Sequence, residues 1–293
     1  MLDHLLGSMP EARRGAVLPT YQRVAAALPE GAPATSIDVA APHWSRARFT
    51  PPIQEPGLLV VNGLHANPLA SSLPSVFLTD VARYALGAGV LLVEDDPFRG
   101  VGPRDDRTPT LLSLHPQGTV YLGSWTKVLG WPVKIGFVGW PRDCLSAERL
   151  RACAPTPEAS GLADLVAVLT NDRAIGIRRR RDALLTSRRA AVAELLRSLE
   201  WPFVPPSGGA HLALLTAQDV RLRRVLAAER IGGLDAAHFY PRSAPRPSHP
   251  FLRLGLSNVP ERDWGDLMAV LVRVLADFRA ASSVDDEEGE RSD

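Results

Sequence analysis

The chain has 293 residues, of which 45% are hydrophobic and 22% are charged, and its formal net charge at pH 7 is +1. This length allows one large or two modest domains with a sizeable core, and the composition is globular, which excludes a chain that is disordered throughout. A net charge near zero gives no overall field that favours nucleic acid or membranes. The N-terminus lacks a signal-peptide pattern and no apolar run is long enough to span a bilayer, so we expect a cytoplasmic protein.

Lysine is the rarest basic residue of this chain. Of its 33 basic residues only Lys127 and Lys134 are lysines, and they lie seven residues apart. A GC-rich genome explains most of the bias towards arginine. Arginine cannot give up its proton at a useful pH, whereas a lysine can become a neutral amine and attack a carbonyl. The lysine pair therefore marks a candidate site for amine chemistry.

Short apolar runs alternate with amphipathic helices in the first half of the chain, which predicts an α/β fold with a largely parallel sheet. Strands are predicted at 58–61, 90–93, 119–122 and 135–138, and a helix at 75–86. Ligands of open α/β sheets bind outside the carboxyl ends of the strands. The polar clusters that follow three of these strands, at residues 62–67, 95–98 and 124–127, are therefore expected to converge on a ligand.

The second half of the chain has a different character. It predicts a helix at 160–169 that leads into a longer helix ending at 199. Further helices are predicted at 218–230 and 260–281, and strands at 211–215 and 251–256. We therefore predict a large domain over residues 1–172 and a smaller C-terminal α+β domain over 173–281. Residues 282–293 are polar and acidic and are predicted to form a disordered tail.

Three other signals carry less weight. The four arginines from Arg178 to Arg181 could bind nucleic acid, but such a run on a helix is more commonly a solvated face. The acidic pairs Asp95-Asp96 and Asp105-Asp106 lack companions at metal-ligand spacing. The two cysteines, Cys144 and Cys153, form neither a disulfide framework nor a zinc motif. We expect no metal and no nucleic-acid partner.

The segment around the lysines resembles fold-type I pyridoxal-phosphate (PLP) enzymes. Gly123-Ser-Trp-Thr-Lys127, followed by Lys134-Ile-Gly-Phe137, is similar to their Gly-Ser-aromatic-Ser/Thr-Lys and Arg-x-Gly-aromatic elements. The similarity is closest to class I/II aminotransferases and to the aminotransferase-like domain of MocR-type regulators, and it runs in the correct order from about Pro19 to Ala281. It implies the PLP-dependent transferase (aspartate aminotransferase-like) fold.

The resemblance assigns roles to the residues near the lysines. Lys127 matches the lysine that forms a Schiff base with PLP and moves protons at the substrate α-carbon. Ser124 and Thr126 match hydroxyls that bind the cofactor phosphate. Lys134 occupies the place of an arginine that clamps this phosphate, so a point charge replaces a bidentate fork.

Four further residues would surround the cofactor ring. Asp95 matches the carboxylate that pairs with the pyridine nitrogen, although a cap or turn role is the alternative. Asn67, in Asn67-Pro-Leu-Ala70, matches an asparagine that contacts the phenolate oxygen of PLP, and Ala70 replaces the usual glycine. Phe98 stands near the place of a tyrosine that hydrogen-bonds the same oxygen and offers no hydroxyl. Tyr21, in Pro19-Thr-Tyr21, resembles the aromatic residue that stacks on the ring, with a core tyrosine as the alternative.

The small domain would supply the substrate contact. Ser207-Gly-Gly209-Ala-His211 resembles the beginning of a family strand, and Arg253, in Phe251-Leu-Arg253-Leu-Gly, matches the arginine that binds the substrate α-carboxylate. An exposed arginine on an alternating strand is the alternative.

The N-terminus departs from the family pattern. Relatives carry an arm, a long helix and a Gly-Ser-x-x-Ala phosphate loop before the Pro-Thr-Tyr element, whereas here Met1 to Leu18 precede it. We interpret the chain as N-terminally shortened, as starting from a misplaced start codon, or as completed by a second chain.

The favoured function is amino-group transfer between an amino acid and a 2-oxo acid by a PLP enzyme, expected as a homodimer. The alternatives are a PLP lyase or cyclase of specialised metabolism, and a non-catalytic homologue that senses a ligand or serves as a scaffold. A MocR-type regulator would also need a winged-helix domain, for which no residues remain.

Overall fold

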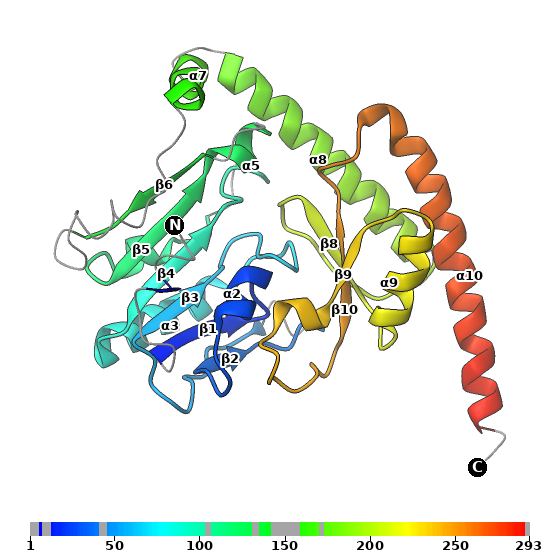
Figure 1. Cartoon of the computed structure of the whole chain (residues 1–293), viewed down its shortest axis with the longest axis horizontal. Helices are drawn as coiled ribbons and strands as arrows, with labels where there is room; N and C mark the ends of the chain where they lie inside the picture. Colours follow the sequence, from blue (N-terminus) through cyan, green and yellow to red (C-terminus); the bar gives the residue numbers. More distant parts are fainter. Residues whose placement is uncertain are drawn as a thin grey trace.

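The computed structural model describes residues 6–7, 13–40, 46–102, 107–130, 135–141, 159–169 and 173–290. These residues form two β-sheets, and Figure 1 shows them side by side with the long helix α8 (Arg173–Ser198) running from one to the other. The first sheet lies within residues 14–139 and the second within residues 203–255. The predicted domain boundary at residue 172 falls between them and stays a prediction.

The first sheet has six strands in the order β2-β1-β3-β4-β5-β6. Neighbours from β2 to β5 pair in parallel, and β6 pairs with β5 in the antiparallel direction. The fold is therefore α/β with a mostly parallel sheet, as the sequence predicts. The strands are β1 (Arg14–Leu18), β2 (Ala34–Ser36), β3 (Leu58–Val61), β4 (Leu91–Asp96), β5 (Thr119–Ser124) and β6 (Gly136–Gly139).

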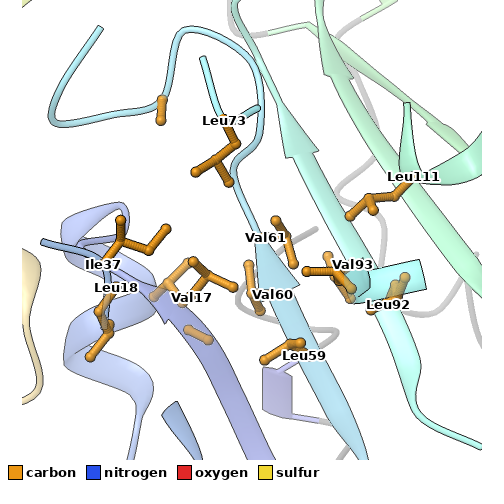
Figure 2. Packing of buried hydrophobic residues seen from close by; sticks show 14 of the residues in the cluster. Val17, Leu18, Ile37, Leu59, Val60, Val61, Leu73, Leu92, Val93 and Leu111 are labelled. Carbon is orange, nitrogen blue, oxygen red and sulfur yellow. The ribbon is translucent and has the colours of Figure 1, made fainter. Parts of the chain in front are cut away.

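The core of the first sheet lies around β3. All four residues of this strand are buried, because a central parallel strand is covered on both faces. In Figure 2 the side chains of Leu59, Val60 and Val61 lie between those of Val17 on β1 and Val93 on β4. This packing fixes the ends of β3 and β4, from which the polar clusters begin.

Helices connect and cover these strands. Helix α3 ends at Gly89, whose φ of 67° is the left-handed conformation that glycine adopts at helix C-termini. The helices of this half are α2 (Gln22–Ala27), α3 (Ser75–Ala88), α4 (Leu111–Leu114), α5 (Trp125–Leu129) and α7 (Ala159–Leu169).

The second sheet has four antiparallel strands in the order β7-β8-β10-β9. A second apolar core packs it against α8, α9 and α10. Its elements are β7 (Phe203–Val204), β8 (His211–Leu215), α9 (Asp219–Ala228), β9 (Gly233–Asp235), the 3-10 turn η3 (Ala236–Phe239), β10 (Phe251–Gly255), the 3-10 turn η4 (Glu261–Asp263) and α10 (Trp264–Glu290).

The C-terminal helix is longer than the sequence predicts. The predicted helix ends at residue 281, whereas α10 continues to Glu290, and the predicted disorder of residues 282–293 stays a prediction. Once a helix is formed, each further residue adds one hydrogen bond, and no proline interrupts the chain after Pro260. Within the described part of the chain, no helix combines the length and the apolar character needed to cross a bilayer.

Candidate active site

Strands β3 and β4 bring two polar side chains to the same edge of the first sheet. The strands pair in parallel with Val61 opposite Glu94, so Asn62 follows the end of β3 next to Asp95 of β4. The amide of Asn62 lies beside the carboxylate of Asp95 and stabilises its charge. The carbonyl Oδ1 of Asn62 accepts a hydrogen bond of 3.3 Å from the backbone N–H of Asn67. Asn62 therefore links β4 to the loop that follows β3.

Asp95 lies in an environment that disfavours its charge. Burial raises the pKa of Asp95 to about 6, the neighbouring Asp96 adds to the shift, and Asn62 and Lys127 oppose it. A carboxylate taken out of water is stabilised most by a cation or a charged donor placed next to it. Asp95 is therefore suited to hold a protonated nitrogen.

Lys127 lies on the short helix α5, directly after β5. The helix ends at Gly130, which has a φ of 68°, and the Lys127 side chain is exposed. Its positive charge acts on Asp95. The backbone carbonyl of Lys127 accepts a hydrogen bond of 2.8 Å from Nε of Arg181 on α8. The interdomain helix therefore holds the backbone that carries the lysine.

Asn67 begins a tight loop in which Ala70 has a φ of 56°. This is the left-handed region, which costs a non-glycine residue roughly 1–2 kcal/mol. The resemblance predicts glycine at the position of Ala70, and the loop has the conformation that glycine favours. The surrounding structure holds this strained turn, and with it the buried side chain of Asn67.

Arg253 reaches Asn67 from the second sheet. Its Nη1 donates a hydrogen bond of 3.2 Å to Oδ1 of Asn67, and its guanidinium lies 5.9 Å from the ring centre of Phe239. Burial lowers the pKa of Arg253, and the charge of Tyr21 partly opposes this shift. Five side chains thus form a continuous group, which we call the polar chain: Lys127, Asp95, Asn62, Asn67 and Arg253.

No protein-family model and no curated protein sequence matches this chain. Solved structures do. The α-aminoadipate aminotransferase of Thermus thermophilus, solved with N-(5'-phosphopyridoxyl)-L-leucine, superimposes with a TM-score of 0.77 at 19% identity, over 96% of this chain and 75% of that one. The chain has the aspartate aminotransferase-like fold.

Two further aminotransferases agree with this assignment. The aromatic aminotransferase of Pyrococcus horikoshii matches with a TM-score of 0.74 at 16% identity, over 95% of this chain and 76% of that one. The aspartate aminotransferase of Thermus thermophilus with maleate matches with a TM-score of 0.69 at 19% identity, over 93% and 72%. These likenesses establish the aminotransferase fold of this chain.

In this aminotransferase fold, two loops join the sheets beside the polar chain. Nδ1 of His65 lies 2.9 Å from Oγ of Ser207, which also lies 2.8 Å from Oγ of Ser72. A Cβ at Gly208 would come within 2.4 Å of the His65 ring, so only glycine allows this contact. The backbone N–H of Ser207 also donates to the Ala70 carbonyl at 2.8 Å.

Sequence reasoning missed these joining residues. His65 lies within the cluster predicted at 62–67 and Ser207 within the Gly-Gly segment, but neither was singled out. Nothing in a single sequence pairs residues that are 142 positions apart. Asn62 was found only as the start of the same cluster.

Phe98 lies outside the polar chain. It is buried among Val101, Val128, Leu185 and Ala210, and its ring meets that of His211 edge-on at 5.3 Å. Burial lowers the pKa of His211 to about 3, so this histidine is neutral. The predicted contact of Phe98 with a cofactor stays a prediction.

The hydroxyls near Lys127 differ in what they do. Thr126 Oγ1 donates to the Ile135 carbonyl at 3.1 Å and accepts from the Ile135 N–H at 2.8 Å, so it closes the loop between α5 and β6. Ser124 makes no side-chain capping hydrogen bond at the start of α5. Lys134 lies outside the described residues. The phosphate-binding roles of all three stay predictions. In addition, Thr126 holds the backbone of Ile135 by two hydrogen bonds.

Proposed function

We propose that this protein binds PLP and transfers an amino group between an amino acid and a 2-oxo acid. The observation that carries the proposal is the polar chain, because it brings an amine, a half-buried carboxylate, two amides and a half-buried guanidinium together at the carboxyl ends of β3 and β4. These are the groups that PLP chemistry on an amino acid requires, and the fold is the one found in aminotransferases.

The donor set suits PLP. Asp95 is a half-buried carboxylate whose pKa is raised to about 6 by desolvation, and a protonated pyridine nitrogen would stabilise its charge. Oδ1 of Asn67 accepts from Arg253, so its Nδ2 is the atom that can donate to the phenolate oxygen of the ring. Bound in this way, PLP supplies an electron sink for the negative charge that develops at the substrate α-carbon.

The protein side chains would divide the remaining work. The Nζ of Lys127 would hold the cofactor at its aldehyde carbon, and the same amine would move a proton to and from the substrate α-carbon. Asp95 keeps the ring nitrogen protonated. Arg253 binds the α-carboxylate with its forked donors, and its burial excludes water that would weaken this contact.

Borohydride reduction tests the attachment. The purified protein is loaded with PLP and reduced, which fixes the bond between cofactor and lysine, and its peptides are mapped by mass spectrometry. We expect the pyridoxyl group on Lys127 and none on Lys134, the only other lysine in the chain. Labelling at Lys134, or no label in excess PLP, would contradict the proposal.

A non-catalytic homologue is the second candidate. It is favoured by Phe98, which has no hydroxyl and packs in an apolar cluster. A single-turnover experiment separates the candidates, because an enzyme loaded with PLP converts an added amino acid into its 2-oxo acid, whereas a sensor or scaffold binds it unchanged. Loss of carbon dioxide or of a side-chain group in the same experiment would instead indicate a PLP lyase or cyclase.

We also propose that the protein forms a homodimer. Helix α7 and the beginning of α8 expose large apolar side chains, including Leu162 at 47%, Val166 at 53% and Ile175 at 52% of their surface. Such residues grouped on neighbouring helices mark an interaction surface. A second copy of this chain is the occupant that the expected dimer would place there.

A further inference from the structure

A cavity of about 280 Å³ lies beside the polar chain, at the ends of β4 and β5. Asp96 and Tyr121 line it from these strands, Ser124 and Trp125 line it from the beginning of α5, and Arg178 lines it from α8. None of the five residues of the polar chain is among its lining residues. Ser124 connects the two places, since it precedes Lys127 by three residues.

The charges of the cavity do not cancel. Its single carboxylate, Asp96, is ion-paired with Nε of Arg99 and accepts a hydrogen bond of 3.0 Å from the Tyr121 hydroxyl. Nη2 of Arg99 is buried and has no hydrogen-bond partner in the described structure. Arg178 adds a second guanidinium, for which no acidic side chain of the described residues provides an ion pair. The cavity therefore carries surplus positive charge.

The position of Arg178 depends on a glycine. Gly100 has a φ of 89°, and a Cβ built on it would lie 3.3 Å from Nη2 of Arg178. The absence of a side chain at Gly100 lets the guanidinium lie against the backbone at the mouth of the cavity. Ser124 lines the same cavity, and its hydroxyl makes no helix-capping bond. The guanidinium of Arg178 and the hydroxyl of Ser124 are hydrogen-bond donors at the same cavity, and such donors are suited to binding an oxyanion.

We infer that Arg178 and Ser124 bind a phosphate group in this cavity, and that Arg178 is the residue that anchors the phosphate of the cofactor. This assignment rests on the proposed function. A phosphate monoester carries nearly two negative charges at neutral pH and takes several charge-assisted hydrogen bonds, which matches two guanidinium groups and a hydroxyl. The first arginine of the run at 178–181 thus has a role, because Arg178 lines the cavity and Arg179 and Arg180 do not.

The test compares ligands with and without the phosphate. Dissociation constants for PLP and for pyridoxal, which lacks the phosphate, are measured by absorbance for the wild type, Arg178→Gln and the matched control Arg179→Gln. We expect Arg178→Gln to weaken PLP binding roughly 10- to 100-fold, the loss of one charged hydrogen-bonding partner, and to leave pyridoxal binding unchanged. Arg179→Gln should change neither constant.

The remaining outcomes overturn the inference. Equal weakening of PLP and pyridoxal by Arg178→Gln would mean that Arg178 acts through the structure, and unchanged PLP binding would mean that it does not touch the phosphate. A third measurement uses inorganic phosphate alone, with thermal unfolding as the readout. Stabilisation by phosphate that requires Arg178, combined with PLP binding that does not, would assign the cavity to free phosphate and overturn the cofactor assignment.

The inference and the proposed function can fail separately. Absence of the Lys127 label would remove the proposed function, while the inorganic-phosphate measurement would still report on Arg178. Conversely, a labelled Lys127 with PLP affinity unaffected by Arg178→Gln would retain the enzyme and remove the inference.

Discussion

Asp95 and Asp96 are adjacent in β4 and serve opposite faces of the first sheet. Asp95 lies with Asn62 and Lys127, whereas Asp96 is bonded to Arg99 and Tyr121. Successive side chains of a strand point to opposite faces, so the two carboxylates have different neighbours. One strand end therefore supports both the polar chain and the wall of the neighbouring cavity.

This separation predicts different consequences for two matched variants. Asp95→Asn should lower the rate of amino-group transfer about 100-fold, because a neutral amide cannot keep the ring nitrogen protonated. Its free energy of unfolding should stay within about 1 kcal/mol of the wild type, since a buried carboxyl with a raised pKa loses little when it becomes neutral.

Asp96→Asn should instead lower the free energy of unfolding by about 1–3 kcal/mol, because it leaves the partly buried Arg99 without its charged partner. Urea unfolding and steady-state kinetics measure both variants. A loss of stability in Asp95→Asn comparable to that in Asp96→Asn would show that both carboxylates are structural.

Arg253→Lys should raise KM for an amino acid substrate roughly 10- to 100-fold with a smaller change in kcat. A lysine offers a point donor, so it cannot serve both Asn67 and a substrate carboxylate as the forked guanidinium can. The control is Arg221→Lys, an exposed position on α9. An unchanged KM would show that Arg253 does not bind the substrate carboxylate and is an ordinary arginine of the strand.

The sequence predicted the parts of the fold that depend on local pattern. The buried run at 58–61 and the strand at 211–215 are found with these bounds, because each is a short apolar segment limited by turn residues. It missed β1, whose apolar run is interrupted by Gly15. Gly15 is required there because a Cβ would meet the Pro33 carbonyl at 2.6 Å, a contact that no local pattern reveals.

The candidate site was predictable where it follows strand ends. Asn67, Asp95 and Lys127 lie within the three polar clusters that the sequence predicts to converge, and the structure brings them together. The link from Arg253 to Asn67 spans 186 positions, and it depends on how the second sheet packs against the first. The cavity was not predictable either, since its charge depends on which arginines of α8 face inwards.

Glu94→Gln should make stability less dependent on pH. Burial raises the pKa of Glu94 from 4.5 to about 7, mainly because desolvation disfavours its charge, although the backbone of Leu112 donates to it. A group whose pKa is raised in the folded state stabilises it fully below the unfolded-state pKa and loses this contribution as the pH rises through the folded-state value.

Between pH 4 and pH 8 the wild type should therefore lose on the order of 3 kcal/mol that the glutamine variant keeps. The measurement is the difference in free energy of unfolding between the two proteins at each pH. A constant difference across the range would mean that folding does not raise the pKa of Glu94.

Val166→Asp should convert the proposed dimer into a monomer. The exposed valine lies among the apolar side chains of α7, and a charge at the centre of an apolar interface is strongly unfavourable. Val272→Asp on α10, where the valine is 43% exposed, is the matched control and should leave the dimer intact. Sedimentation velocity distinguishes the two states, and a monomeric wild type would end the dimer proposal.

Phe98→Tyr and Asn67→Ala should shift the pH titration of the bound cofactor in opposite directions. A donor on the phenolate oxygen of PLP draws negative charge away from the neighbouring nitrogen of Lys127, so the added hydroxyl of Phe98→Tyr lowers the pKa of that nitrogen, and loss of the Asn67 amide raises it. Visible absorbance against pH measures both shifts, with Phe203→Tyr on the half-buried strand β7 as the control. The experiment also tests where the side chain of residue 98 lies. Phe98 contacts His211 edge-on within an apolar cluster, and a tyrosine hydroxyl that stayed in this cluster would not reach the cofactor. If Phe98→Tyr leaves the titration unmoved while Asn67→Ala shifts it, Phe98 belongs to the core and Asn67 is the side chain that contacts the oxygen.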